Sequence, residues 1–421
     1  MALDVAITGM GVISALGQSP GELYDRLAAD ELAITQVPWT VDDPDRFEWW
    51  APVTGFDPSK WMDERTIAGS DPFAQQSIAA ASEALKAAGI DKLAPLRTAI
   101  VLGTAKNGTQ SLERAQYDVD RLGREGVSGK LMIRVWPNMA ASQVAMHWKL
   151  HGPCLTLSTA CASSLDAVGL GARLIASGQA DVAIVGGTEG GLAFETDDGF
   201  VPASAYSRYA YGMGGNITDP RKACQPFDRG RAGMVFGEGT GIFILESAAH
   251  AAKRGATPLA WVQGWGTAAD SFHPSTPDPT GDWERLAMEI ALKEAGVGPE
   301  AIDALAAHGT GTPKGDLAEI AAANTLYGKH APNVSVMSIK GTLGHPTGAA
   351  GAIGLAVGLE GMARGEVIHT GGTHDPEPSI AFDLVLDKPR KKTVGWLQAN
   401  AFGFGGQNAS LVVSARQARH R

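Results

Sequence analysis

The chain has 421 residues, of which 44% are hydrophobic and 19% are charged, a composition typical of a soluble enzyme with a large core. A net charge of −10 without any lysine- or arginine-rich run argues against binding to nucleic acid or to an anionic membrane. The three cysteines lack CxxC spacing, which argues against a metal cluster or a disulfide scaffold and favours a reducing cytoplasm.

Short apolar strands alternate with alanine-rich helices along the first part of the chain, an order typical of α/β layering. Residues 5–14 predict a buried strand; Asp4 and the lack of a basic stretch make this segment a poor match to a signal peptide. Residues 71–90 predict an amphipathic helix that ends in glycine. The other elements expected here are a strand at 97–105, a helix within 158–178, and strands at 180–191 and 237–247.

A second series of elements in a similar order begins near residues 250–257, which predicts two domains, 1–253 and 254–421. The halves have no visible sequence identity, so duplication is a hypothesis. The expected elements are a strand at 257–270, a helix at 282–297, a strand and turn at 301–316, a helix at 317–328, a strand and turn at 334–345, a buried helix at 347–359 and a closing segment at 394–415. Segment 347–359 is too short to span a bilayer. Residues 42–50 and 276–281 are expected to form surface loops.

Residues 158–164, STACASS, place Cys161 among small side chains just before a long apolar helical stretch. The unpaired N–H groups and the positive dipole at a helix start stabilise a thiolate, so we expect a lowered pKa and a nucleophilic sulfur. The small neighbours would let an extended acyl thioester reach the sulfur. A buried structural cysteine is the alternative, since most free cysteines are of that kind.

Two later segments place histidines near glycines. His308 follows a strand in HGTGT, where the hydroxyls of Thr310 and Thr312 would fix its orientation, although a loop histidine without a role fits as well. In KGTLGH, Lys340 lies beside a buried helix start and needs a charged partner, for which Glu319 is the natural candidate. His345 precedes a helix N-terminus, which favours a neutral imidazole that can donate a hydrogen bond to a carbonyl oxygen.

The segment NAFGFGGQN, residues 400–408, sets Phe402, Gly403 and Phe404 in a glycine-rich turn. It is interpreted as a mobile apolar flap whose free backbone N–H groups suit an oxyanion hole. A packed turn is the alternative.

In this order, the TACASS, HGTGT, KGTLGH and GFGG segments resemble the beta-ketoacyl-[acyl-carrier-protein] synthases of the thiolase superfamily, the type II fatty-acid and polyketide kind. VAITGMGVISALG, GPCLTLSTACASS, GGTE and CQPFDRGRAGMVFGEG extend the resemblance over essentially the whole chain. It implies an α/β thiolase fold of two similar halves, each with a five-stranded mixed sheet, in a layered α-β-α-β-α arrangement.

The resemblance also implies roles. Cys161 would take the acyl chain from a carrier-protein thioester, and His308 and His345 would promote malonyl decarboxylation and stabilise the enolate. Lys340 would belong to the polar network with Glu319. The backbone N–H groups of Cys161 and Phe402 would form the oxyanion hole, with Phe402 also gating the acyl pocket. The supporting residues would be Thr310, Thr312, Gly403 and Phe404, and no metal or cofactor is implied.

Three departures from the family pattern favour a type II polyketide or polyene pathway. They are Gln407 after GFGG, few basic residues (Lys60 and Arg65) in 59–71, and the aromatic, glycine-rich stretch 206–220. The expected partners are an acyl carrier protein and a second subunit, in a homodimer or in a heterodimer with a chain-length factor.

Three other functions share features with this sequence. Fatty-acid elongation by a homodimer stays open. A non-catalytic chain-length factor is disfavoured because Cys161, His308 and His345 are all present. A degradative thiolase is disfavoured because no cysteine follows Cys224.

Overall fold

The computed structural model describes residues 3–37, 48–191, 193–196, 199–202 and 217–417. The strands are β1 (Val5–Ser14), β2 (Thr35–Gln36), β3 (Trp49–Ala51), β4 (Thr98–Gly103), β5 (Cys154–Leu157), β6 (Val182–Glu189), β7 (Ala193–Thr196), β8 (Gly199–Pro202), β9 (Phe236–Gly237), β10 (Gly239–Glu246), β11 (Ala260–Ala269), β12 (Ala304–Ala306), β13 (Ser335–Met337), β14 (Glu366–Val367), β15 (Asp383–Leu384), β16 (Arg390–Lys391), β17 (Trp396–Gly403) and β18 (Gln407–Ser414). The helices are α1 (Pro20–Ala28), α2 (Glu64–Gly69), α3 (Pro72–Ala88), α4 (Thr109–Leu122), α5 (Leu131–Val135), α6 (Met139–Trp148), α7 (Ser163–Ala176), α9 (Ala248–Lys253), α10 (Asp282–Ala295), α11 (Pro313–Tyr327), α12 (Lys340–Leu343) and α13 (Ala350–Arg364).

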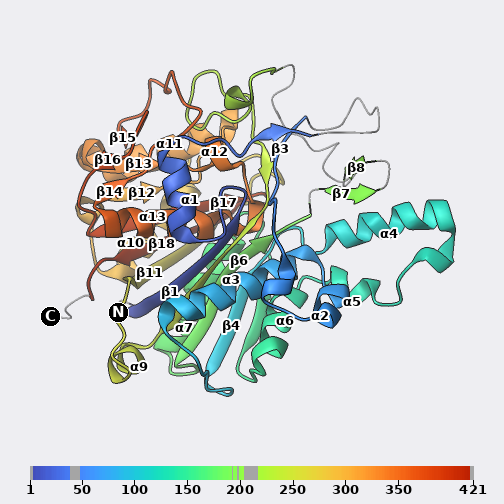
Figure 1. Cartoon of the computed structure of the whole chain (residues 1–421). Helices are drawn as coiled ribbons and strands as arrows, with labels where there is room; N and C mark the ends of the chain where they lie inside the picture. Colours follow the sequence, from blue (N-terminus) through green and yellow to red (C-terminus); the bar gives the residue numbers. More distant parts are fainter. Residues whose placement is uncertain (1–2, 38–47, 192, 197–198, 203–216, 418–421) are drawn as a thin grey trace.

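Helices and sheets alternate in five layers, as the resemblance implied (Figure 1). The apolar helices α7 and α13 form the central layer and contact strands of both halves of the large sheet. Helices α3 and α6 cover the outer face of the first half, and α10 and α11 cover that of the second. The central helices are buried on nearly every side, which explains why both are so rich in alanine, glycine and leucine.

The two halves share one continuous sheet of mixed direction. Its strand order is β15-β13-β12-β17-β18-β11-β1-β10-β6-β4-β5. The first half supplies five strands, as expected, and the second adds β15 as a sixth. An antiparallel pairing of Val5–Ile7 in β1 with Ala260–Val262 in β11 joins the halves at one end of β1.

Matching pairs of glycines reveal a structural repeat between the halves. Gly9 and Gly11 of β1 lie against the backbone of α3, where an added Cβ would approach backbone oxygens to 2.2 and 2.1 Å. Gly264 and Gly266 of β11 lie equally close to α10. Each pair also follows a break in the strand register. Glycine is needed at each of these contacts because a side chain would separate helix and sheet. The hypothesis of duplication thus has structural support that sequence identity does not provide.

Most strands and helices expected from the sequence are present, but several details differ. The segment 42–50 was expected to be a surface loop; its residues 42–47 lie outside the described part, whereas Trp49 and Trp50 belong to β3 and are buried. The segment 334–345 contains the short helix α12 as well as a strand. Residues 206–216 of the aromatic stretch 206–220 also lie outside the described part.

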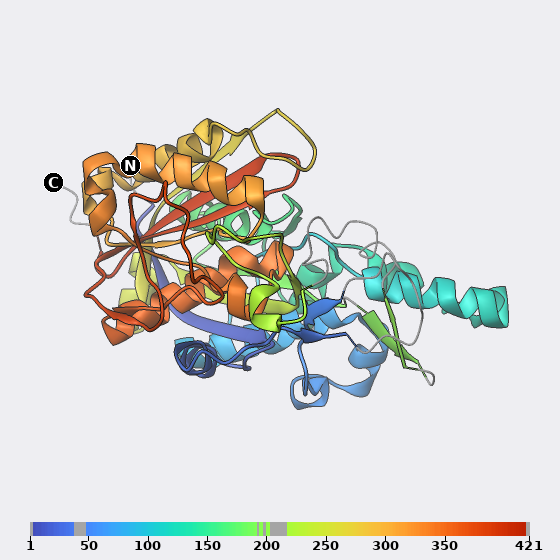
Figure 2. The same ribbon diagram turned by 90° about the horizontal axis from the view of Figure 1, so that it is seen from above.

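Helix α4, which the sequence did not predict, projects away from the layered body (Figure 1, Figure 2). None of its residues is fully buried, and it packs mainly against α5 and the turn at residues 124–126. No described helix combines the length and the apolar composition needed to cross a membrane.

Candidate active site

A pocket of about 310 Å³ collects the residues singled out from the sequence. Cys161 precedes the central helix α7, and His345 occupies a similar place before the other central helix, α13. His308 follows strand β12. The three side chains therefore come from both halves of the fold and meet in one pocket, which Phe402, Phe404, Thr310, Thr312 and Gly403 also line.

The turn that carries Cys161 has a strained backbone conformation. Ala160 has a φ of +50°, in the left-handed region that side chains with a Cβ seldom occupy. The Ser163 hydroxyl locks this turn, since it donates to the carbonyl of Ala160 at 2.6 Å and accepts from the N–H of Thr159 at 2.9 Å. The hydroxyl of Thr159 in turn donates to Asp166 at 2.6 Å. These contacts keep the sulfur pointing into the pocket.

Cys161 and His345 are in direct polar contact. The Nε2 atom of His345 lies 3.1 Å from the Sγ atom of Cys161. Burial raises the pKa of the Cys161 thiol to about 11, although the charge of Lys340 and nearby backbone N–H groups lower it. The expectation of a lowered pKa was therefore wrong, because it considered the helix start and not the loss of solvent at a side chain that is 7% exposed.

Both histidines are buried and neutral. Burial and the charge of Lys340 keep the pKa of His308 and that of His345 well below the ordinary value. The two rings meet edge to face, with centroids 5.4 Å apart. Neutral imidazoles at this distance can act together on one substrate oxygen.

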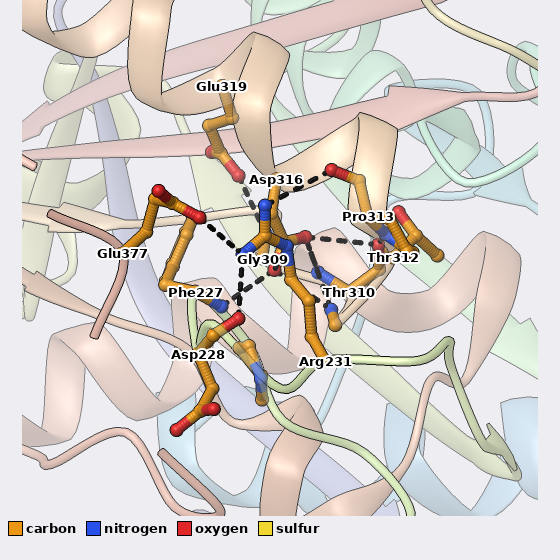
Figure 3. A network of polar contacts seen from close by, with 12 residues as sticks. Phe227, Asp228, Arg231, Gly309, Thr310, Thr312, Pro313, Asp316, Glu319 and Glu377 are labelled. Carbon is orange, nitrogen blue, oxygen red and sulfur yellow. Dashed lines mark hydrogen bonds and ion pairs between the residues drawn. The ribbon is translucent and has the colours of Figure 1, made fainter. Parts of the chain in front are cut away.

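The loop of His308 is held by carboxylates from the first two turns of α11 (Figure 3). Glu319 accepts hydrogen bonds from the backbone N–H groups of His308 and Gly309 at 2.8 and 2.7 Å. Asp316 accepts from the N–H groups of Thr310 at 3.0 Å and Phe227 at 2.6 Å. Burial raises the pKa of Glu319 to about 7. Helix α11 thus fixes the backbone of the loop that carries His308 through these two carboxylates.

Arg231 fastens the same loop from outside the pocket (Figure 3). Its guanidinium donates to the carboxylate of Glu377 at 3.0 Å and to the carbonyls of Asp228 and Pro313 at 2.6 and 3.2 Å. Its Nε atom lies 4.0 Å from a carboxylate oxygen of Asp316. The sequence analysis gave Arg231 no role, although CQPFDRGRAG contributed to the resemblance, because the residues it joins are far apart in the chain.

Lys340 does not form the direct ion pair with Glu319 that the sequence predicted. Its ammonium group donates to the backbone carbonyl of His308, whereas Glu319 binds the N–H groups of the same loop. The two charges still attract each other, since Glu319 raises the pKa of Lys340 against the effect of burial. The backbone at His308 is therefore held from two sides, with Lys340 at its carbonyl group and Glu319 at its N–H group.

Phe404, and not Phe402, presents a backbone N–H to the sulfur of Cys161. The N–H groups of Phe404 and of Cys161 itself lie against the sulfur and lower its pKa. Phe402 lies in β17 opposite Asn408, and its buried ring packs 5.8 Å from that of His308. The side chain of Phe404 is 44% exposed at the mouth of the pocket. The N–H against the sulfur and the ring at the mouth of the pocket, both expected of Phe402, are therefore those of Phe404.

Gly403 lets this turn approach the nucleophile. A Cβ at this position would lie 2.7 Å from the carbonyl oxygen of Thr159 and 3.1 Å from the nitrogen of Cys161. Nearby, the hydroxyls of Thr310 and Thr312 are hydrogen-bonded to each other at 2.9 Å.

Two further charged residues act on the site and had no role assigned from the sequence. Glu189, the last residue of GGTE, accepts from the hydroxyl of Thr104 at 3.1 Å, and its charge raises the pKa of Cys161. Lys106 lies near it, and its charge lowers the pKa of His345. The GGTE segment contributed to the resemblance without a role for Glu189, and no sequence signal pointed to Lys106.

The ligand atoms of Cys161, His308 and His345 lie within 4.8 Å of one another, a spacing that also suits a metal ion. Lys340 opposes such binding, because its positive charge already lowers the pKa of both histidines. The geometry suits acid–base and nucleophilic chemistry better than metal coordination.

Comparison with known proteins places the chain in a family. Residues 2–251 match the N-terminal domain of beta-ketoacyl synthase, and residues 259–373 match its C-terminal domain. The chain is 32% identical over 414 residues to 3-oxoacyl-[acyl-carrier-protein] synthase 2 of Coxiella burnetii, covering 97% of this chain and 98% of that protein. It is 34% identical over 419 residues to the Rhizobium meliloti protein of that name, with the same coverage.

Solved structures agree. A beta-ketoacyl synthase from Burkholderia phymatum has a TM-score of 0.87 and 29% identity, covering 99% of this chain and 100% of that chain. The structure titled the ishigamide ketosynthase/chain length factor has a TM-score of 0.87 and 28% identity, covering 98% of each chain. The chain therefore belongs to the beta-ketoacyl synthase family, a family of acyltransferase-type enzymes with the thiolase fold.

Proposed function

We propose that the protein condenses an acyl chain held on Cys161 with malonyl-acyl carrier protein, releasing CO₂ and forming 3-oxoacyl-acyl carrier protein. The observation that carries this proposal is the 3.1 Å contact between Cys161 Sγ and His345 Nε2, with His308 beside it in the same pocket. A carbon–carbon bond forms readily when an acyl electrophile is held covalently beside a carbanion.

In the first half-reaction, the Cys161 sulfur attacks the thioester carbonyl of the acyl-loaded carrier. The thiol proton passes to Nε2 of His345 and then to the departing carrier thiol, so no net proton is gained or lost. The backbone N–H groups of Cys161 and Phe404 are placed to bind the oxyanion, because both lie against the sulfur. Because burial keeps the resting thiol protonated, the sulfur ionises as the substrate binds.

In the second half-reaction, malonyl-carrier protein loses CO₂, and the electron pair of the broken C–C bond forms the thioester enolate. His308 and His345, both neutral, donate hydrogen bonds to the enolate oxygen, for which His345 adopts the tautomer with its proton on Nε2. The enolate carbon attacks the acyl-enzyme carbonyl, and the Cys161 sulfur leaves as a thiolate. It then takes up one proton from solvent, which is the proton that the half-reaction consumes overall. Lys340 supports this step by fixing the backbone of His308.

The pathway proposed is a type II polyketide or polyene pathway, with fatty-acid elongation as the second candidate. The ishigamide ketosynthase/chain length factor supports the first, whereas the curated relatives named 3-oxoacyl-[acyl-carrier-protein] synthase 2 support the second. The proposed partners are an acyl carrier protein and a second subunit, which is a chain-length factor in the first case and another copy in the second. Native mass spectrometry of the protein purified from its host distinguishes the two assemblies.

The reaction is tested by mass spectrometry of the protein after incubation with acyl-carrier proteins. We expect one acyl group on Cys161, none in Cys161→Ala, and full acylation in the control Cys154→Ser, which changes an exposed cysteine. Acylation of Cys161→Ala would overturn the proposal. Acceptance of polyenoyl or 3-oxoacyl chains favours the polyketide pathway, and restriction to saturated chains favours fatty-acid elongation.

A further inference from the structure

Glu284 is a buried acid in the first turn of α10 that lines the same pocket as Cys161. The residue is 2% exposed, and its Oε2 atom is buried without a hydrogen-bond partner among the described residues. Other acids around the pocket are satisfied. Asp270, for example, accepts from the amide of Asn408 at 2.6 Å and from the N–H of Asp278 at 3.1 Å.

A buried carboxyl group without a partner destabilises a fold, because it has lost its hydration and gained no hydrogen bond. Within the described residues, Glu284 caps no helix, joins no ion pair and fixes no loop, so it has no structural use that offsets this cost. Such a group is explained when a bound ligand completes its hydrogen bonds.

The surroundings of Glu284 define which ligand it suits. Burial raises its pKa well above the ordinary value, and the charges of Glu319 and Asp270 raise it further. The group is then a neutral carboxylic acid, which donates one hydrogen bond through its O–H and accepts through its C=O. The acidic neighbours repel an anion, so the malonyl carboxylate is a poor ligand here, and an uncharged oxygen is a good one.

Glu284 lies inside the pocket, away from its exposed mouth. The mouth of the pocket is lined by the exposed residues Pro313, Lys314 and Phe404, where a carrier-bound arm would pass. Glu284 is buried from solvent and lies on the wall that α10 contributes.

We propose that Glu284 is a specificity-determining residue whose carboxyl group hydrogen-bonds a keto or hydroxyl oxygen on the acyl chain carried by Cys161. This inference rests on the proposed function, since it assumes acylation of Cys161. It predicts that the enzyme prefers partly oxygenated chains, and that the preference depends on one side chain.

The test compares wild type, Glu284→Gln and Glu284→Leu on acyl-carrier thioesters of one chain length. One substrate is saturated, and the others carry a single keto or hydroxyl group at successive carbons. We expect wild type to acylate Cys161 faster, in kcat/KM, with at least one oxygenated chain than with the saturated chain. In Glu284→Leu, the ratio of kcat/KM for the oxygenated chain to that for the saturated chain should fall about tenfold. Glu284→Gln keeps a hydrogen-bond donor and an acceptor, so it should retain most of this ratio.

Thermal denaturation separates this role from a structural one. Because Glu284→Leu removes an unpartnered buried acid, its melting temperature should equal or exceed that of wild type. An unchanged preference in Glu284→Leu, or an equal loss on saturated and oxygenated chains, would overturn the inference. The failure of the proposed function looks different, since no chain of either kind would then be found on Cys161.

Discussion

The Nε2 atom of His345 lies 3.1 Å from the sulfur of Cys161, although 184 residues separate them in the chain. Each residue precedes one of the two central helices, α7 and α13, in corresponding halves of the repeat. The contact is therefore formed by residues that precede the two central helices, one from each half of the fold.

The contact with the sulfur predicts different effects for the two histidines. His308→Ala should slow malonyl decarboxylation by on the order of a hundredfold and acylation much less, because no hydrogen bond joins His308 to Cys161 among the described residues. His345→Ala should slow both half-reactions. Radiolabelled CO₂ release and acyl-enzyme mass spectrometry measure them separately, with His151→Ala, at an exposed site, as the control. Equal losses in both half-reactions for both variants would contradict the assignment.

Arg231 is expected to stabilise the loop of His308. Arg231→Leu leaves Asp316 and Glu377 without their cation and should lower the free energy of unfolding by about 3 kcal/mol. Urea denaturation measures the change. The matched control is Arg229→Leu, because Arg229 forms an exposed pair with Asp375 and should contribute less than about 1 kcal/mol. Similar losses of unfolding free energy in the two variants would show that the buried contacts of Arg231 stabilise the fold no more than an exposed ion pair does.

Gly403 is expected to be essential for rate. In Gly403→Ala, the new methyl group meets the Thr159 carbonyl, so the turn must move and carry the N–H of Phe404 away from the sulfur. We expect kcat to fall on the order of a hundredfold. The control is Gly354→Ala in α13, where the methyl group meets nothing within 4 Å and alanine favours the helix. A Gly403→Ala enzyme with normal kcat would refute the role of this close approach.

The raised pKa of Glu319 makes the stability of the fold depend on pH. Its pKa is raised from 4.5 to about 7 in the folded protein, so the folded state holds this proton more tightly than the unfolded state. This contribution is complete below pH 4.5 and is lost as the pH rises through 7, a change of about 3 kcal/mol. Glu319→Gln lacks it. The unfolding free energy of the variant, measured by urea denaturation, should therefore rise relative to wild type between these pH values. Parallel curves would contradict the prediction.

The sequence predicted the elements whose patterns are local. Helix α3, for example, has Asp71 as its N-cap, an apolar face and Gly89 at its C-cap, all readable within one segment. The pocket residues that lie in short motifs, such as Cys161, His308 and His345, were likewise predicted from the sequence. The pairing of β1 with β11 and the added strand β15 involve distant segments and have no local signal.

The predictions about the site were wrong where a property depended on burial or on strand register. The pKa of Cys161 followed from solvent loss around the whole pocket, not from its place before a helix. Phe402 and Phe404 look alike in the sequence, since each lies between small residues. The pairing of Gly403 with Gln407 places Phe402 in the strand and Phe404 in the turn, which no composition rule distinguishes. Arg231 and Glu284 depend on contacts made across the fold.

The position of Phe404 has a consequence for how the enzyme admits substrates. One residue supplies both the ring at the mouth of the pocket and the N–H against the sulfur. An acyl chain that pushes the ring aside by turning the backbone also withdraws a hydrogen-bond donor from Cys161. Under the proposed function, access to the pocket and stabilisation of the Cys161 thiolate therefore depend on the same residue.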